Sequence, residues 1–182
     1  KFVKACHSFG IGVLVDVVHN HYGPTDLDLW RFDGSFVSGG PVGGYGGIYF
    51  YQQTGLCCTP WGNTRPNYNS SQVRSFIQDT FSMWLDECHV DGFRWDSPYY
   101  MMNSDAGFNT DAQTLIQQCS SLIHTGFLGK INIGESEGWL SGTAGFDSTW
   151  YGSPFQDYVV SQLTTASDAA RNMGSISAAV NA

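Results

Sequence analysis

Hydrophobic and polar positions follow two alternating patterns along this chain, one typical of buried strands and one typical of amphipathic helices. Short apolar runs predict strands at residues 11–15, 90–95, 130–134 and 145–150. Apolar residues at three- and four-residue steps predict helices at residues 1–8, from residue 71 onward, at 110–124 and at 154–170. The run at 11–15 is rich in branched side chains and predicts a strand buried on both faces. This alternation predicts an α/β fold in which helical crossovers join parallel strands.

Two further predictions concern the helix that begins near Ser71 and the end of the chain. Ser70 or Ser71 is the expected cap of that helix. One buried face is expected from the apolar stripe Val73, Phe76, Ile77, Phe81, Trp84 and Leu85. The tail 172–182 consists mostly of small and polar residues and is expected to be loose.

Residues 22–69 follow neither pattern and are rich in Gly, Pro and aromatic residues. An irregular segment of this length inside a compact domain is abnormal unless it is functional. Its aromatic residues favour a packed segment over a disordered one: Trp30, Phe32, Tyr45, Tyr49, Phe50, Tyr51 and Trp61. We therefore expect residues 1–21 and 70–182 to form one unit, and 22–69 an inserted subdomain that shapes a cleft.

Composition narrows the classes of function. The chain has 182 residues, enough for one domain, and its aromatic share of 15% suits stacking on a flat sugar face. A net charge of -8 argues against nucleic acid or an anionic membrane as a partner, and no apolar run is long enough for a membrane span. The five cysteines are odd in number, predict no disulfide framework and read as small hydrophobes, which slightly favours a cytosolic location.

Three predicted strands each end in a carboxylate: Asp16, Asp96 and Glu135. Functional side chains of parallel α/β folds lie at the carboxyl ends of strands, so these acids predict one active site. The alternative is that each acid caps a helix. The nearby Arg94 and His21 favour the active site, because Arg94 is two residues from Asp96 and points to the same side of the strand.

The segments around these acids resemble the signatures of the α-amylase family, glycoside hydrolase family 13. Residues 16–21, 92–96 and 134–135, the last with Trp139, are similar to its first three signatures. The segment 22–69 stands where that family inserts its small second domain. The stretch 16–30, followed by residues 46–50 and 59–62, is most similar to the branching-enzyme and maltooligosyltrehalose-hydrolase side of the family.

The resemblance implies a partial TIM (β/α)₈ barrel, about strands three to six, with a long irregular insertion after the first visible strand. A complete barrel needs about 250 residues. The family's fourth signature, on strand seven, is not found, so we interpret the chain as an internal fragment that is inactive and marginally stable alone, because two sheet edges would be unpaired.

The resemblance also implies roles for the site residues. Asp96 matches the nucleophile, kept ionised by Arg94, and Glu135 matches the general acid/base, in a pocket expected to be partly desolvated and lined by Trp. Glu137 is a second acid nearby, but the Gly-Glu match favours Glu135. Asp16 and His21 match positions that contact or support the reacting sugar, although His21 could instead be a core histidine.

Three further residues keep open alternatives. Tyr22 and Trp139 match positions that could stack on glucose, and ordinary packing explains each equally well. Asn20 matches a calcium ligand of many amylases, but six or more oxygen ligands cannot be assembled from the sequence. No cofactor is otherwise required.

The implied function is a retaining glycosidase or transglycosidase acting on α-1,4-glucans such as starch, glycogen or maltooligosaccharides. One alternative is a 1,4-α-glucan branching enzyme, in which a glucan chain replaces water as the acceptor. Another is a non-catalytic glucan-binding relative, which the retained acids disfavour. Tyr99-Tyr100 replaces a frequent Lys-His pair and leaves the acceptor subsites open.

Overall fold

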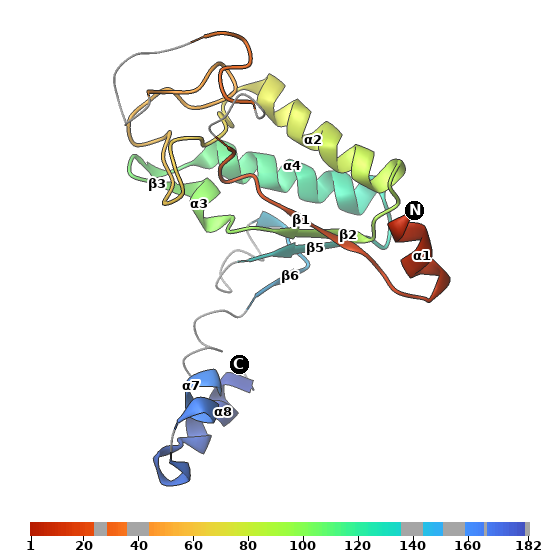
Figure 1. Cartoon of the computed structure of the whole chain (residues 1–182), viewed down its shortest axis with the longest axis vertical. Helices are drawn as coiled ribbons and strands as arrows, with labels where there is room; N and C mark the ends of the chain where they lie inside the picture. The colour runs from red at the N-terminus through yellow and green to blue at the C-terminus, as the bar shows by residue number, and fades with distance from the viewer. Residues whose placement is uncertain (24–28, 36–43, 136–143, 151–158, 166, 181–182) are drawn as a thin grey trace.

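The structure is a computed structural model that describes the chain except residues 24–28, 36–43, 136–143, 151–158, 166 and 181–182 (Figure 1). Helices run over α1 Phe2–Ser8, α2 Ser71–Asp86, α3 Tyr99–Met102, α4 Thr110–Gly126, α7 Ser161–Thr164 and α8 Met173–Val180, with a 3₁₀ turn at Asp168–Ala170. Strands run over β1 Leu14–Val17, β2 Gly92–Trp95, β3 Asn103–Ser104, β4 Gly107–Phe108, β5 Ile131–Gly134 and β6 Ser148–Thr149.

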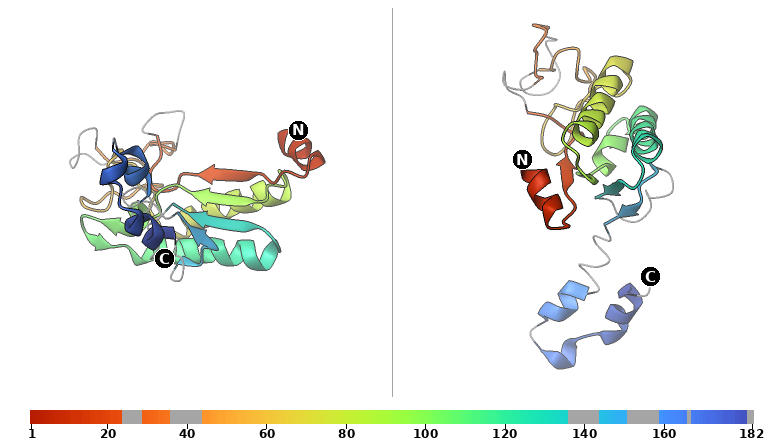
Figure 2. Two further views of the ribbon diagram at one scale, coloured as in Figure 1. Left: turned by 90° about the horizontal axis from the view of Figure 1, so that it is seen from below. Right: turned by 90° about the vertical axis from the view of Figure 1, so that its right-hand side faces the viewer.

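Strands β1, β2, β5 and β6 form one sheet in that order, and all three pairings are parallel. Helices α2 and α4 are the crossovers between neighbouring strands and lie together over one face of the sheet (Figures 1 and 2). The predicted α/β fold with parallel strands is confirmed. The carboxyl ends of the strands therefore meet at one edge. Asp16 is the last but one residue of β1, and Asp96 and Glu135 directly follow β2 and β5 at this edge.

The core lies between this sheet and the two helices. Ser70 caps α2, because its hydroxyl accepts a hydrogen bond from the Val73 N–H at 3.4 Å. Phe81 of α2 stacks on Trp95 of β2, with ring centroids 4.9 Å apart. Four of the predicted stripe residues are buried, but the prediction is wrong for Phe76, which is 49% exposed. Phe76 lies toward the end of the stripe that faces the irregular segment 22–69, which is called the excursion below.

The prediction that the first strand is buried on both faces is wrong. The strand begins at Leu14, which is 43% exposed, and ends at the buried Val17. The reason lies in the arrangement of the layers: β1 is an edge strand, and α2 and α4 cover only one face of the sheet. Ile131 of β5 lies on the same open face in register with β2 and is 45% exposed.

The described part of the 22–69 segment is packed although it has only two isolated bridges, Phe50 with Pro66 and Thr59 with Gly62. The expected packing is found for Trp30, Tyr45, Tyr49, Phe50 and Tyr51, which are buried. It is not found for Phe32 and Trp61, which are 58% and 52% exposed. Cys57 and Cys119 are buried, whereas the other cysteines are half-buried.

The C-terminal part differs most from the sequence-based expectation. The tail expected to be loose forms helix α8, because the Asn172 side chain accepts a hydrogen bond from the Ser175 N–H at 3.1 Å and so caps it. The helix expected at 154–170 is only the short α7 and a 3₁₀ turn in its described part. None of the described helices combines the length and apolar character that a membrane crossing needs.

Candidate active site

Arg94 stands at the centre of an acid cluster at the carboxyl ends of β1, β2 and β5. Its Nη1 lies 2.7 Å from Asp16 Oδ1 and 3.0 Å from Asp96 Oδ1, and its Nη2 lies 2.7 Å from Glu135 Oε2. Strand register explains why these side chains meet. Asp16 of β1 is the Cα partner of Arg94, and so is Ile133 of β5. Asp96 lies two residues after Arg94 and Glu135 two residues after Ile133, so both point to the same side as Arg94. One guanidinium thus joins all three predicted acids.

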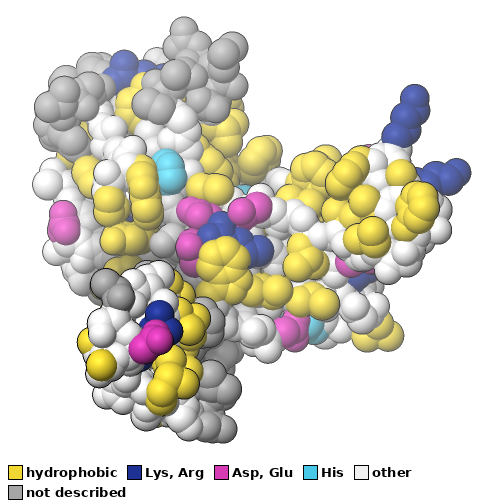
Figure 3. Space-filling view, turned by 60° about the horizontal axis from the view of Figure 1, so that its bottom comes forward, with side chains coloured by type: hydrophobic (Ala, Val, Ile, Leu, Met, Phe, Trp, Pro, Cys, Tyr) yellow, Lys and Arg dark blue, Asp and Glu magenta, His cyan; other side chains and the backbone are white. Residues whose placement is uncertain are grey.

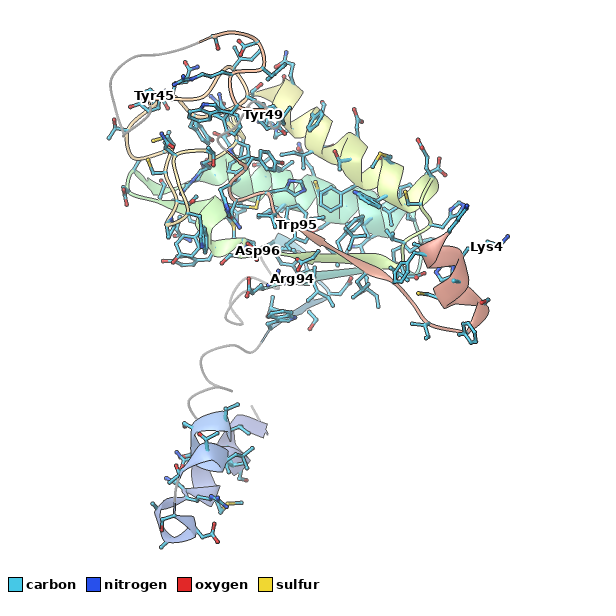
Figure 4. The ribbon with its side chains drawn as sticks, viewed as in Figure 1. Lys4, Tyr45, Tyr49, Arg94, Trp95 and Asp96 are labelled. Carbon is cyan, nitrogen blue, oxygen red and sulfur yellow. The ribbon has the colours of Figure 1, made fainter. Side chains whose placement is uncertain are left out.

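The cluster lies on the open face of the sheet, opposite to the helices. Figure 4 shows Arg94 and Asp96 side by side at the end of β2, with Trp95 on the side of the helices. In Figure 3 a basic group lies among acidic groups near the middle of the molecule. The Asp96 and Glu135 side chains are 27% and 36% exposed, so a ligand in solution can reach both.

Local backbone geometry places Glu135. Gly134 precedes it with no side chain because a Cβ there would lie 2.8 Å from the Phe146 ring. Glu135 Oε2 also accepts a hydrogen bond from the Ser97 N–H at 3.0 Å. Ser97 holds a φ of 39°, a region that costs a non-glycine residue energy, so the turn after Asp96 is strained at the residue that donates this N–H.

The sequence predicts a partly desolvated, Trp-lined pocket around Glu135. The Glu135 side chain is 36% exposed, so solvent is partly excluded from it, and it is paired with Arg94. The Trp that carried that prediction, Trp139, lies outside the described residues. An aromatic residue that the sequence did not single out does lie at the cluster: the Trp150 ring covers Arg94, with the guanidinium carbon 4.4 Å from its centroid.

Asn20 supports Asp96. It is fully buried, and its Nδ2 donates to the Asp96 backbone oxygen at 2.8 Å and to Asp96 Oδ2 at 2.9 Å. Its Oδ1 pairs with His21 Nδ1. The amide is therefore committed to the acid cluster, and within the described residues no group of three or more His, Cys, Asp or Glu side chains could hold a metal ion. Calcium at Asn20 stays a prediction, because its ligands also include backbone and amide oxygens.

His21 lies at the rim of the cluster beneath an aromatic group from the excursion. The Trp61 ring stacks on His21 with centroids 5.2 Å apart and planes 19° apart. The centroid of the Trp61 ring also lies 4.9 Å from that of Tyr100. Burial lowers the pKa of His21, while the Asp96 charge acts in the opposite direction. Sequence reasoning named Trp61 only among the aromatic residues of the cleft-shaping segment and did not name Trp150 as a site residue. The one signal for Trp150 was its place at the end of the predicted strand 145–150.

Tyr22 packs behind the site. Its ring lies 5.7 Å from that of Tyr49, and its hydroxyl lies 2.6 Å from His19 Nδ1. Burial raises the pKa of Tyr22 well above its ordinary value and lowers the pKa of His19 to about 4. In the structure Tyr22 therefore makes the packing contacts that were the alternative to sugar stacking.

The electrostatic balance of the cluster is uneven. Burial disfavours the charged form of Arg94, but the hydrogen bond to Asp16 and the charges of Glu135 and Asp16 outweigh it, so the pKa of Arg94 is raised. Three acids share this one cation, and two of them stand on adjacent strands, which lie about 4.8 Å apart in a sheet. Such a pair can supply one nucleophile and one proton donor on opposite sides of a glycosidic bond.

Comparisons with known proteins give relatives among glucan enzymes, although no family model matches the chain. It is 30% identical over 172 residues to the 1,4-α-glucan branching enzyme GlgB of Dechloromonas aromatica (strain RCB), a match covering 82% of this chain and 26% of the relative. It is also 30% identical over 173 residues to GlgB of Nitratidesulfovibrio vulgaris (strain DP4), covering 82% and 25%. The chain thus spans about a quarter of the length of these curated relatives.

Two solved structures share the fold at low sequence identity. The maltogenic α-amylase AmyB of Thermotoga neapolitana superposes with a TM-score of 0.56 at 21% identity, over 81% of this chain and 30% of that one. An Anoxybacillus α-amylase superposes with a TM-score of 0.61 at 14% identity, over 86% and 33%.

Proposed function

The chain belongs to the α-amylase family, glycoside hydrolase family 13, and we propose that it forms part of a retaining enzyme that cleaves α-1,4-glucans. One observation carries the proposal: Arg94 gathers Asp16, Asp96 and Glu135 at the carboxyl edge of a parallel sheet. Retaining enzymes hold their two carboxyl groups about 5–5.5 Å apart, close to the spacing of adjacent strands.

We further propose that the sheet corresponds to about strands three to six of a (β/α)₈ barrel. In that fold helices surround the outside, and the inward-facing side chains of the strands fill the centre. The covered face under α2 and α4 would then be the outside. The open face with Leu14, Arg94 and Ile131 would be turned to the barrel interior, which explains why the apolar Leu14 and Ile131 are exposed in this chain.

The proposed reaction has two steps. Asp96 attacks the anomeric carbon while Glu135 donates its proton to the departing glycosidic oxygen, which leaves a covalent glucosyl-Asp96 intermediate. Glu135 then takes a proton from an acceptor hydroxyl, and the acceptor oxygen displaces Asp96. Arg94 and Asn20 hold the Asp96 carboxylate in place for both steps. Asp16 and His21 are proposed to contact the sugar, and no cofactor takes part.

A branching reaction is the second candidate. It differs only in the acceptor, which is a glucan 6-hydroxyl in place of water. The curated relatives described above support it because they are named 1,4-α-glucan branching enzymes. Trp61, which stacks on His21 and meets the Tyr100 ring edge to face, also favours it, because aromatic faces suit a sugar acceptor.

The test is to incubate amylose with the longer protein of which we expect this chain to be part, and to count new reducing ends and new α-1,6 branches. Reducing ends without branches would identify a hydrolase, and branches with few reducing ends a branching enzyme. Asp96→Asn is the matched negative control. If amylose binds but neither product forms, the proposed chemistry is wrong and the non-catalytic alternative holds.

A further inference from the structure

Two adjacent cysteines in the excursion bring their sulfur atoms together. Cys57 Sγ and Cys58 Sγ lie 2.7 Å apart. The Cys57 side chain is fully buried, whereas Cys58 is half-buried and lines a cavity of about 370 Å³ together with Tyr99 and Tyr100. One sulfur of the pair is thus accessible to a small molecule and the other is not.

Arg65 holds the backbone of both cysteines. Its N–H donates to the Cys57 carbonyl at 3.0 Å, and its Nη2 donates to the Cys58 carbonyl at 2.7 Å. Arg65 is itself only 1% exposed, so this clamp is part of the packed interior. With both peptide groups held in this way, the two thiols already lie beside each other in the resting fold.

We propose that Cys57 and Cys58 form a reversible dithiol–disulfide pair that small-molecule disulfides oxidise. The Cys58 thiolate attacks one sulfur of the oxidant, its proton goes to solvent, and the first thiolate of the oxidant leaves. Cys57 then loses its proton and attacks Cys58 Sγ, which breaks the mixed disulfide and releases the second thiolate. The two protons end on the two released thiolates, so two protein thiols are oxidised and one disulfide is reduced.

Because the two cysteines are adjacent in the chain, we expect their disulfide to be easily reversed and not to act as a permanent cross-link. Adjacent Cα atoms are about 3.8 Å apart across a trans peptide, below the usual 4.4–6.8 Å span of a disulfide. A bond closed outside that span is readily reduced. Burial raises the pKa of Cys57 to about 12, so the closing step, which needs its thiolate, is expected to be slower than the attack by Cys58.

The pair is connected to the acid cluster through a short turn. Directly after Cys58, Thr59 and Gly62 form a bridge in which the Thr59 N–H donates to the Gly62 carbonyl at 2.7 Å. This turn carries Trp61, the residue stacked on His21. Closing the ring at Cys57–Cys58 changes the path of the chain into the turn. We therefore expect oxidation of the pair to move Trp61 relative to His21. This part of the inference rests on the proposed function.

The experiment treats the folded longer protein, of which we expect this chain to be part, with oxidised glutathione, stops exchange with acid, alkylates free thiols and maps tryptic peptides by mass. Cys57 and Cys58 fall together in the peptide 32–74, because Pro66 blocks cleavage after Arg65, and no other cysteine lies there. We expect this peptide to lose two hydrogen atoms and to take up no alkyl group, and mild reductant to restore two alkylation sites. Two alkyl groups, or glutathione that stays on Cys58, would overturn the proposal.

Two variants and one internal control sharpen the result. Cys57→Ser should trap glutathione on Cys58, and Cys58→Ser should leave Cys57 unmodified because it is buried. Cys88 is half-buried and lies in another peptide, so it reports thiol accessibility without ring closure. Trp61 is followed by the fluorescence difference between the chain and Trp61→Phe; no change on oxidation would overturn the link to the site. None of these readouts depends on glucan activity.

Discussion

The two ends of the same sheet carry two charge clusters of opposite composition. At the carboxyl end, one cation, Arg94, faces the three acids described above. At the amino end, one acid, Asp91, faces several donors: it accepts a hydrogen bond from the Val13 N–H at 2.7 Å and lies 2.8 Å from His7 Nε2 and 3.3 Å from Lys130 Nζ.

This difference distinguishes a charge cluster that stabilises the fold from one that is available for chemistry. The Val13 hydrogen bond, followed by His7 and Lys130, lowers the pKa of Asp91 to about 2, as expected for an acid whose charge is fully satisfied. The carboxyl end has more acids than its cation can neutralise and is backed by a strained turn at Ser97. In a barrel, the carboxyl end is the reactive end and the amino end stabilises the fold. Each prediction below tests this contrast.

The largest effect is expected at Glu135. Replacing it by Gln in the active protein removes the proton donor and should lower kcat on amylose by about 10²–10⁴-fold. Asp91→Asn, the same kind of change at the other end of the sheet, should leave kcat of the folded protein unchanged. Equal losses of kcat in the two variants would show that the contrast between the ends is wrong.

A second prediction concerns His19, buried behind the acid cluster. Its pKa is about 4 in the folded chain and about 6.5 when unfolded, so the unfolded chain binds the proton first as pH falls. The free energy of unfolding should therefore have its full value above pH 6.5 and fall by about 3 kcal/mol between pH 6.5 and pH 4.

Urea titrations across this pH range measure that loss. His19→Asn is the matched variant, because an amide can still pair with the Tyr22 hydroxyl but does not titrate. Its stability at neutral pH should be lower, and its stability profile over the same pH range should be flatter than that of the parent chain. A variant with the same pH slope would assign the acid sensitivity to other groups.

A third, smaller effect is expected at the amino end. Asp91→Asn should lower the free energy of unfolding at pH 7 by about 1–2 kcal/mol, allowing for partial solvent screening. Because the folded pKa of Asp91 is depressed, its contribution is present above about pH 4 and is lost as pH falls toward 2. The difference between variant and parent, measured by chemical denaturation, should therefore shrink in acid; a constant difference would contradict the ionic origin.

The smallest effect is expected at Lys130. It is the most distant of the three donors to Asp91, and the Asp91 side chain is 31% exposed. Lys130→Gln should change the free energy of unfolding by about 0.5 kcal/mol or less, as is usual for partly exposed ion pairs. A loss as large as that of Asp91→Asn would mean that Lys130, and not the Val13 hydrogen bond, provides most of the stabilisation of the Asp91 charge.

Local information in the chain was sufficient for most of the elements. Short apolar runs located the strands, and the 3.6-residue period located α2 and α4, because burial requires apolar side chains at the positions that face the core. The same patterns placed Asp16, Asp96 and Glu135 at strand ends. They failed at α8, where the small residues hide an Asn172 cap, and at Leu14, whose exposure depends on which layers surround it.

The meeting of distant residues depended on the tertiary structure. Arg94 reaches Asp16 across 78 positions, and Trp61 reaches His21 from an excursion with no regular periodicity, so neither contact follows from local spacing. The roles of Asp96 and Glu135, and the division at residues 22–69, stay predictions. Residue type and period are local properties that the chain carries in its order, whereas partners and exposure are properties of the neighbours that packing brings together.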